Sequence, residues 1–231
     1  GWHSDAEMTI TSSSDKSKAT LVDEDGTAHI FTKLADQSYK APTGVYLELT
    51  EASTSFILTT KDQTKAHFSK QTGRLTKMID GYGNTSTYTY DTAGKLTTMT
   101  DASSRTLTFT YNTDGFVSSV IGPDNRKVTY SYQDGFLTKV TQTAGEVTSY
   151  EYNTGKLVKV YEPNHTETKP VVNEYAYDPD TDHLKEVINS KQQKYLLNYD
   201  LPNKTLLFTQ PNGRKIQYSF NEAANPIQMI E

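Results

Sequence analysis

Aromatic residues recur along this chain at an almost constant spacing. Successive positions are separated by 22, 21, 21, 20, 25, 22 and 21 residues, at Phe68, Tyr90, Tyr111, Tyr132, Tyr152, Tyr177, Tyr199 and Phe220. A fixed period of this length is the signature of a repeat architecture, in which one unit cannot bury its own apolar face and must contact its neighbours. The chain is therefore expected to fold as an array of units of about 21 residues, and the longest interval, around Asn164 to Val172, indicates a loop insertion.

Each unit predicts two short strands joined by a turn. Tyr88 and Tyr90 alternate with threonines, so that both rings lie on one face of a strand. The turn 91–94 follows, in which Asp91 bonds nearby amides and Gly94 supplies a positive φ. A second strand carrying Leu, Thr and Val or Met and a second polar turn complete the unit. The expected fold is all-β, a long antiparallel meander of β-hairpin repeats.

Two sets of residues are expected to build these repeats rather than to bind a ligand. Aromatic side chains that recur in register pack across strands, and each such pair contributes roughly 0.2–1 kcal/mol. The predicted structural aromatics are Tyr88, Tyr90, Tyr111, Tyr130, Tyr132, Tyr150, Tyr152, Tyr175 and Tyr177. The predicted turn glycines are Gly94, Gly115, Gly135 and Gly155.

One spacing does not fit a flat strand. Leu96 and Met99 are three residues apart, as are Leu137 and Val140. On a flat strand these side chains would point to opposite faces. The segments are too short and too rich in threonine for a helix, which leaves two explanations: a β-bulge, or a leucine that belongs to the preceding turn.

Composition predicts a thin structure with few binding partners. Hydrophobic residues make up 34% of the chain, yet it contains 16 Tyr and 8 Phe, which favours sheet with little deep interior. The net charge is −5, and charged residues are spread along the chain, so no nucleic-acid partner is expected. No apolar run approaches the ~20 residues of a membrane span. The absence of cysteine excludes thiol catalysis and suits both cytosol and a large bacterial surface protein.

The first residues are less regular than the rest. Strands are expected at 19–22 and 27–32 around the turn 23–26, and further strands at 45–49 and 56–60. The predicted organisation is an N-terminal β segment over 1–55, followed by tandem repeats over 56–231, in one continuous structural unit. The start at 1–4 has no signal-peptide pattern, which fits either a cytosolic protein or an internal piece of a longer one. The internal piece is favoured, because the repeat is already running at both ends of the chain.

Catalytic and metal-binding patterns are scarce. No Gly-x-Ser-x-Gly motif, phosphate-binding glycine loop or zinc-type histidine spacing occurs, so we predict no enzyme activity and no cofactor. The acidic residues Asp178, Asp180 and Asp182 could supply oxygen ligands to a hard cation such as Ca²⁺. The full calcium-loop pattern is absent, however, and a polar hairpin turn is the favoured interpretation.

The motif Tyr-x-Tyr-Asp…Gly-x-Leu, repeated over 56–231, resembles the YD-repeat, or RHS-repeat, family. The stretch 21–31 is similar to the segment that precedes the repeats in bacterial members. The resemblance implies a β-strip that spirals into a hollow shell, as in wall-associated and secreted polymorphic-toxin proteins, where the shell encloses a C-terminal toxin domain. The chain departs from the pattern at Gln133 and Asn153, which replace Asp, and at 200–203, a turn without glycine. The self-cleaving plug of bacterial shells has no match.

Two functions are compatible with these features. The first is a non-catalytic section of a shell that encloses or presents a toxin domain of a large bacterial protein, secreted or held at the cell wall. Its partner would be the rest of the same polypeptide, including the enclosed C-terminal domain. The second is a carbohydrate-binding, cell-wall-binding or adhesion module, in which tyrosines stack on sugar rings and the repeats supply avidity.

Overall fold

The computed structural model describes residues 5–164, 166, 171–221 and 226–230. The chain forms two compact units, Gly1–Arg126 and Lys127–Glu231, and each is described by itself. The predicted loop insertion falls largely outside the described residues, and so does the four-residue start. The prediction of one continuous structural unit stays a prediction.

The first unit begins with a small antiparallel sheet. A 3-10 turn, η1 (Asp5–Glu7), precedes four strands in the spatial order β1-β2-β3-β4. Their bounds are β1 (Thr9–Ser12), β2 (Lys18–Val22), β3 (Ala28–Lys33) and β4 (Tyr39–Lys40). The sequence correctly predicts β2, β3 and the turn between them, where the Asp23 carboxylate accepts a hydrogen bond from the Thr27 amide at 2.9 Å. It does not predict β1 or β4.

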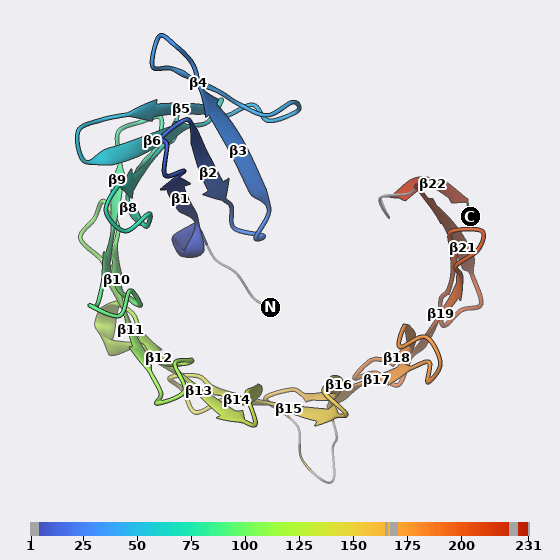
Figure 1. Ribbon diagram of the computed structural model, residues 1–231. Coiled ribbons are helices and arrows are strands. Elements are labelled where there is room, and N and C mark those ends of the chain that lie inside the picture. Colours follow the sequence, from blue (N-terminus) through green and yellow to red (C-terminus); the bar gives the residue numbers. More distant parts are fainter. Residues whose placement is uncertain (1–4, 165, 167–170, 222–225, 231) are drawn as a thin grey trace. The chain divides into compact units, whose positions relative to one another are not determined.

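The rest of the first unit is a meander in which each strand pairs antiparallel with the next (Figure 1). The strand predicted at 45–49 lies instead at β5, because pairing with β6 begins at Glu48. The 3-10 turn η2 (Pro123–Asn125) ends the unit. The strands are β5 (Glu48–Glu51), β6 (Ser55–Thr59), β7 (Lys65–Ser69), β8 (Leu75–Ile79), β9 (Thr85–Tyr90), β10 (Leu96–Thr100), β11 (Thr106–Tyr111) and β12 (Val117–Ile121).

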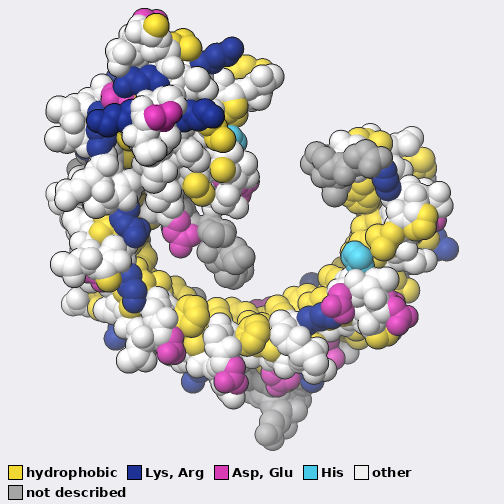
Figure 2. All heavy atoms as spheres, in the orientation of Figure 1, with side chains coloured by type: hydrophobic (Ala, Val, Ile, Leu, Met, Phe, Trp, Pro, Cys, Tyr) yellow, Lys and Arg dark blue, Asp and Glu magenta, His cyan; other side chains and the backbone are white. Residues whose placement is uncertain are grey.

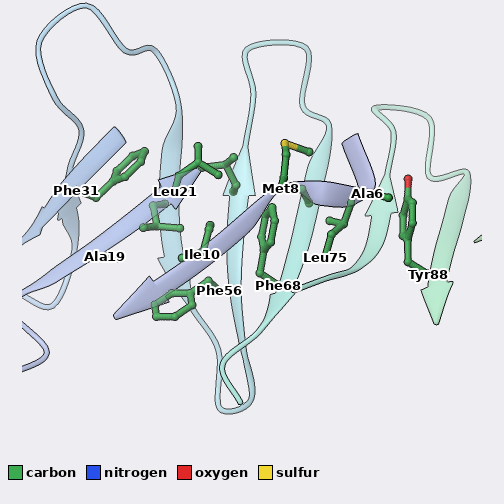
Figure 3. Packing of buried hydrophobic residues seen from close by; sticks show 13 residues of the cluster. Ala6, Met8, Ile10, Ala19, Leu21, Phe31, Phe56, Phe68, Leu75 and Tyr88 are labelled. Atoms are coloured by element: carbon green, nitrogen blue, oxygen red, sulfur yellow. The ribbon is translucent and has the colours of Figure 1, made fainter. Parts of the chain in front are cut away.

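The small sheet covers the apolar face of the first meander strands and forms a two-layer core with them (Figure 3). Phe31 from β3 and Phe68 from β7 are both fully buried in this core. The layers are also joined through the backbone, since the Ile10 amide donates to the Gly73 carbonyl at 2.8 Å. At the rim, the Glu51 carboxylate accepts from Lys33 at 3.1 Å and from Lys70 at 2.9 Å.

The second unit is a single layer of paired strands without a covering sheet. Its described part has only two buried hydrophobic residues, Val172 and Ile216. Hydrophobic side chains form a band along β13 to β18, with acidic side chains outside the band (Figure 2). The thin architecture expected from composition is therefore found here. The strands are β13 (Lys127–Gln133), β14 (Phe136–Thr141), β15 (Val147–Asn153), β16 (Lys156–Tyr161), β17 (Val172–Tyr177), β18 (Leu184–Ile188), β19 (Lys194–Asp200), β20 (Thr205–Thr209), β21 (Lys215–Phe220) and β22 (Pro226–Ile230).

The irregular leucine spacing is explained by β-bulges. In β10, Leu96 pairs with Tyr90 and Thr98 pairs with Thr89, so Thr97 is an extra residue. The same shift occurs within the β7–β8, β11–β12, β13–β14, β15–β16, β17–β18 and β21–β22 pairs. The extra residue brings residues three apart to one face, which decides between the two explanations in favour of the bulge.

The structure holds almost no helix, as predicted, since its described helices are the two three-residue 3-10 turns. None of the described helices is long and apolar enough to cross a membrane.

Candidate functional site

The predicted turn glycines all adopt the left-handed conformation. Gly94, Gly115, Gly135 and Gly155 have φ of +81°, +91°, +81° and +80°. In the turn after β9, the Gly94 amide donates to the Asp91 carbonyl at 3.0 Å, and the Lys95 amide donates to the Asp91 carboxylate at 2.8 Å. A residue with a Cβ is strained at such φ values, so these glycines serve the turn itself.

The first tyrosine of each pair takes part in a cross-strand ladder. Tyr130 faces Val140, Tyr150 faces Val160 and Tyr175 faces Val187 in the strand registers. In the first unit Tyr88 faces Met99 and is buried, and its hydroxyl donates to the Met78 sulfur at 3.2 Å. These aromatic–aliphatic pairs are the packing units of a sheet face.

The second tyrosine reaches back to the preceding hairpin in the repeats of Tyr90, Tyr111, Tyr152 and Tyr177. Its hydroxyl donates a hydrogen bond to the backbone carbonyl of a leucine at the start of the second strand of that hairpin. These bonds join Tyr90 to Leu75 at 2.8 Å, Tyr111 to Leu96 at 2.8 Å, Tyr152 to Leu137 at 3.0 Å and Tyr177 to Leu157 at 2.9 Å. We call each of these bonds a tyrosine latch, because it ties one hairpin to the next.

A further side chain covers the ring of the second tyrosine, and it comes from the residue directly before the same leucine. The cationic examples are Arg74 over Tyr90 at 5.3 Å, Lys95 over Tyr111 at 5.1 Å and Lys156 over Tyr177 at 5.5 Å from the ring centroid. The ring examples are Phe136 on Tyr152 at 4.9 Å and His183 on Tyr199 at 4.8 Å between centroids.

Sequence reasoning missed these covering residues, although a signal was present. In five repeats the residue between the turn glycine and the following leucine or valine is cationic or aromatic: Arg74, Lys95, Phe116, Phe136 and Lys156. Both side-chain types stack on an aromatic face, the cations through cation–π attraction.

Burial raises the pKa of several tyrosine hydroxyls in the repeats. Burial raises the pKa of Tyr90 to about 12. It also raises the pKa of Tyr111, Tyr132, Tyr150, Tyr152 and Tyr175 above the usual value for tyrosine. A phenol is already protonated at neutral pH, and the raised pKa extends the range in which these hydroxyls can donate a hydrogen bond to more alkaline pH.

The structure does not bring the three candidate metal ligands together. The Asp178 carboxylate accepts from the Asp180 and Thr181 amides at 3.1 and 3.0 Å, which is a turn arrangement that lowers its pKa. Asp182 forms an ion pair with Lys156. Within the described ranges, no group of three or more His, Cys, Asp or Glu side chains could hold a metal ion.

Three histidines lie in the described residues: His29, His67 and His183. His29 Nε2 contacts the Asp23 carboxylate at 2.6 Å beside the β2–β3 turn. His183 stacks on Tyr199. His67 faces Lys77 across the β7–β8 pair, and desolvation together with Lys77 and Lys65 lowers its pKa. His29 and His183 thus have structural partners, whereas His67 Nε2 is buried without a hydrogen-bond partner in the described part of the chain.

Successive hairpins joined by tyrosine latches define a repeat-built β protein. The family model described as Teneurin YD-shell matches residues 50–173, which is more than half of the chain. The chain belongs to the YD-shell family, as its Tyr-x-Tyr-Asp motif predicts.

Relatives with assigned names agree with this membership. The chain is 58% identical to the tRNA nuclease WapA of Bacillus subtilis strain 168 over 232 aligned residues, which cover 100% of this chain and 10% of that protein. It is 57% identical, at the same coverage, to the tRNA3(Ser)-specific nuclease WapA of Bacillus spizizenii strain DSM 15029. The chain thus spans about a tenth of the length of these relatives.

Solved structures show the same fold at low sequence identity. The crystal structure of TcdB2-TccC3-Cdc42 matches with a TM-score of 0.51 and 15% identity over 89% of this chain and 12% of that one. TcdB2-TccC3 without its hypervariable C-terminal region matches with a TM-score of 0.52 and 16% identity, over 93% and 12% of the two chains.

Proposed function

We propose that this chain is a non-catalytic section of a YD-shell wall, and that the shell encloses or presents a toxin domain located elsewhere in the same polypeptide. The observation that carries the proposal is the use of the repeat side chains. Tyrosine hydroxyls, and the cations and rings that a binding site would employ, are directed at the neighbouring hairpin. A surface built in this way supplies structure rather than chemistry.

The relatives support the assignment of structure to this chain and of catalysis to another segment. They are named as tRNA nucleases, and the matched stretch is a tenth of their length. We place any nuclease activity of the parent protein in a different segment, and the partner of this chain is then the rest of its own polypeptide. Export to the cell exterior, with attachment to the cell wall, is part of the same proposal.

Carbohydrate binding has less support. Arg74, Lys95 and Lys156 each lie over a ring of the repeat, so that face is not free for a sugar. Among the described residues, the strongly exposed rings are Tyr46 and Tyr82, at 74% and 96% exposure, and neither belongs to the repeated aromatic position.

Protease protection in the full-length parent polypeptide tests the enclosure. We compare the wild type with a variant lacking residues 91–132, which removes two units and keeps the repeat phase. The proposal predicts that a toxin domain resistant to protease in the wild type becomes sensitive in the deletion variant. A Tyr82→Ala variant, altered only at an exposed turn, is the control and should behave as the wild type.

Two results would contradict the proposal. Equal protease resistance of the toxin domain in the wild type and the deletion variant would show that this wall section does not enclose it. Cleavage of tRNA by the isolated 231-residue chain would show that the chain is catalytic. Binding of cell-wall sugar that Tyr82→Ala abolishes would favour the carbohydrate-binding alternative.

A further inference from the structure

The repeated aromatic position is tyrosine in six units and phenylalanine in two, and the two phenylalanines are not randomly placed. Phe68 follows the β5–β6 hairpin and Phe220 follows the β19–β20 hairpin. Both of these hairpins pair in continuous register, without a bulge. Each of the six tyrosines follows a hairpin that contains a bulge: Tyr90, Tyr111, Tyr132, Tyr152, Tyr177 and Tyr199.

The ladder to the next hairpin differs between the two cases. After a straight hairpin, the ladder runs through five residue pairs, and Leu206 itself pairs with Tyr218. After a bulged hairpin, it contains three pairs and begins two residues beyond the leucine, so that β10 pairs with β11 from Thr98 onwards and Leu96 is left out. The bulge therefore removes the leucine carbonyl from the ladder between units.

The latch supplies the missing hydrogen bond. The Tyr111 hydroxyl donates to the Leu96 carbonyl, and the Tyr90, Tyr152 and Tyr177 hydroxyls do the same for the corresponding leucines. A backbone carbonyl left without a partner in a partly buried position costs free energy, and a phenol is long enough to reach it from the next strand. Where no bulge exists, the ladder satisfies the carbonyl and a phenyl ring suffices.

We infer that the repeated aromatic is a positioning residue whose hydroxyl is specified by the hairpin before it: a bulged hairpin requires a following tyrosine, and a straight hairpin accepts phenylalanine. The rule concerns how wall units are joined and is independent of what the wall encloses. Whether the repeated position holds tyrosine or phenylalanine is thus set by a backbone bulge about 15 residues upstream. Tyr111, for example, lies 15 residues after Leu96.

The rule predicts that removing the Tyr111 hydroxyl matters only while the β9–β10 hairpin has its bulge, so the two changes are tested separately and together. Four forms of the full-length parent polypeptide are compared by amide hydrogen exchange over residues 96–111: wild type, Tyr111→Phe, deletion of Thr97, and both changes together. Tyr111→Phe is expected to speed exchange about fivefold to tenfold in the wild-type background, because one partly buried acceptor loses its donor. In the Thr97-deleted background, where the register is continuous, the same substitution should change exchange by less than about twofold.

Tyr195→Phe, which keeps a ring stacked on Phe208, is the control and should leave exchange over residues 96–111 unchanged.

A second experiment introduces a bulge into a straight hairpin, and it tests the rule even if deletion of Thr97 prevents folding. A threonine inserted between Leu206 and Leu207 creates a bulge in β20 and should speed exchange over 205–220, and Phe220→Tyr should then restore at least half of the protection. Phe220→Tyr alone should have no effect. The rule is overturned if Tyr111→Phe has equal effects in both backgrounds, or if Phe220→Tyr protects the chain without the insertion or fails to protect it with the insertion.

Discussion

The first strands of the chain and the hairpins of the second unit share one strand-turn-strand plan, but their apolar faces have different environments. In β5 to β8 that face packs under the β1–β4 sheet, and the six largest fully buried side chains of the described chain are all here: Ile10, Leu21, Phe31, Leu49, Phe68 and Leu75. In β13 to β22 the strands form one layer, and most aromatic rings remain half-exposed. Layer packing dominates the first region, whereas contacts from each hairpin to its neighbour dominate the second.

Truncating a core ring should show the largest contrast between the two regions. Phe68→Ala is expected to lower the free energy of unfolding by about 3–5 kcal/mol, because it opens a cavity between two layers. Phe208→Ala in β20 should cost less than half as much, because that side chain is only partly buried. Guanidinium unfolding of the 231-residue chain measures the stability of both variants. Equal losses would mean that covering by the β1–β4 sheet adds nothing to the stability of the meander strands.

Substituting the turn glycines should give the next largest effect and separates backbone strain from crowding. Gly155→Ala should cost about 1 kcal/mol, since its φ is unfavourable for alanine but its nearest neighbour, Phe136, lies at an ordinary 3.7 Å. Gly94→Ala should cost about 2 kcal/mol, since the new methyl group would also displace the Arg74 guanidinium from its place over the Tyr90 ring. Thermal unfolding compares the two variants. Adding Arg74→Ala to Gly94→Ala should remove the excess, and an unchanged excess would refute the displacement.

The smallest expected effect is the pH dependence of the stability that the Glu51 contacts contribute. It reports on how the β1–β4 sheet is attached to the meander, because Glu51 in β5 pairs with Lys33 in β3. Burial alone would raise the pKa of Glu51, but hydrogen bonds from Tyr39, Lys70 and Lys33 outweigh it and lower the pKa to about 2. A carboxyl group with a lowered folded-state pKa contributes stability that is present above its unfolded pKa, near 4.5, and is lost as the pH falls towards 2.

After allowance for solvent screening, this contribution is about 1 kcal/mol. Glu51→Gln should therefore flatten that part of the stability profile between pH 4.5 and 2, as measured by unfolding at a series of pH values. An unchanged profile would mean that these contacts do not help to hold the layers together.

The sequence was sufficient for the parts of the fold that repeat. Alternation of Tyr and Thr predicted strands such as β9, and Asp91 with Gly94 predicted the turn after it, because both signals are local. It left the bulge undecided at Leu96, since a bulge is defined by the partner strand. It missed β1, whose sequence TITS has one buried residue, Ile10, and forms a strand through pairing with β2.

The candidate site was predicted to the same extent. The tyrosines and glycines were singled out because they recur. The structure places them in strand pairs and in turns with positive φ, and their role stays a prediction. The covering residues Arg74, Lys95 and Lys156 were missed because a cation in a turn is ordinarily a solvated surface residue. Their role depends on a ring in the following unit, which local patterns do not connect to them.

The latch also sets where this chain can gain or lose units by recombination. The leucine and the tyrosine that form one joint, such as Leu96 and Tyr111, lie on opposite sides of the return turn between two hairpins. A genetic exchange with breakpoints in the turns between hairpins, such as 101–105, would separate the leucine from its tyrosine. A bulged hairpin could then be followed by a unit with phenylalanine at the repeated position. Breakpoints in the glycine turns, at 91–95 and 112–116, keep each leucine with its own tyrosine. The module that can be exchanged without mismatch therefore runs from one glycine turn to the next and does not coincide with the hairpin.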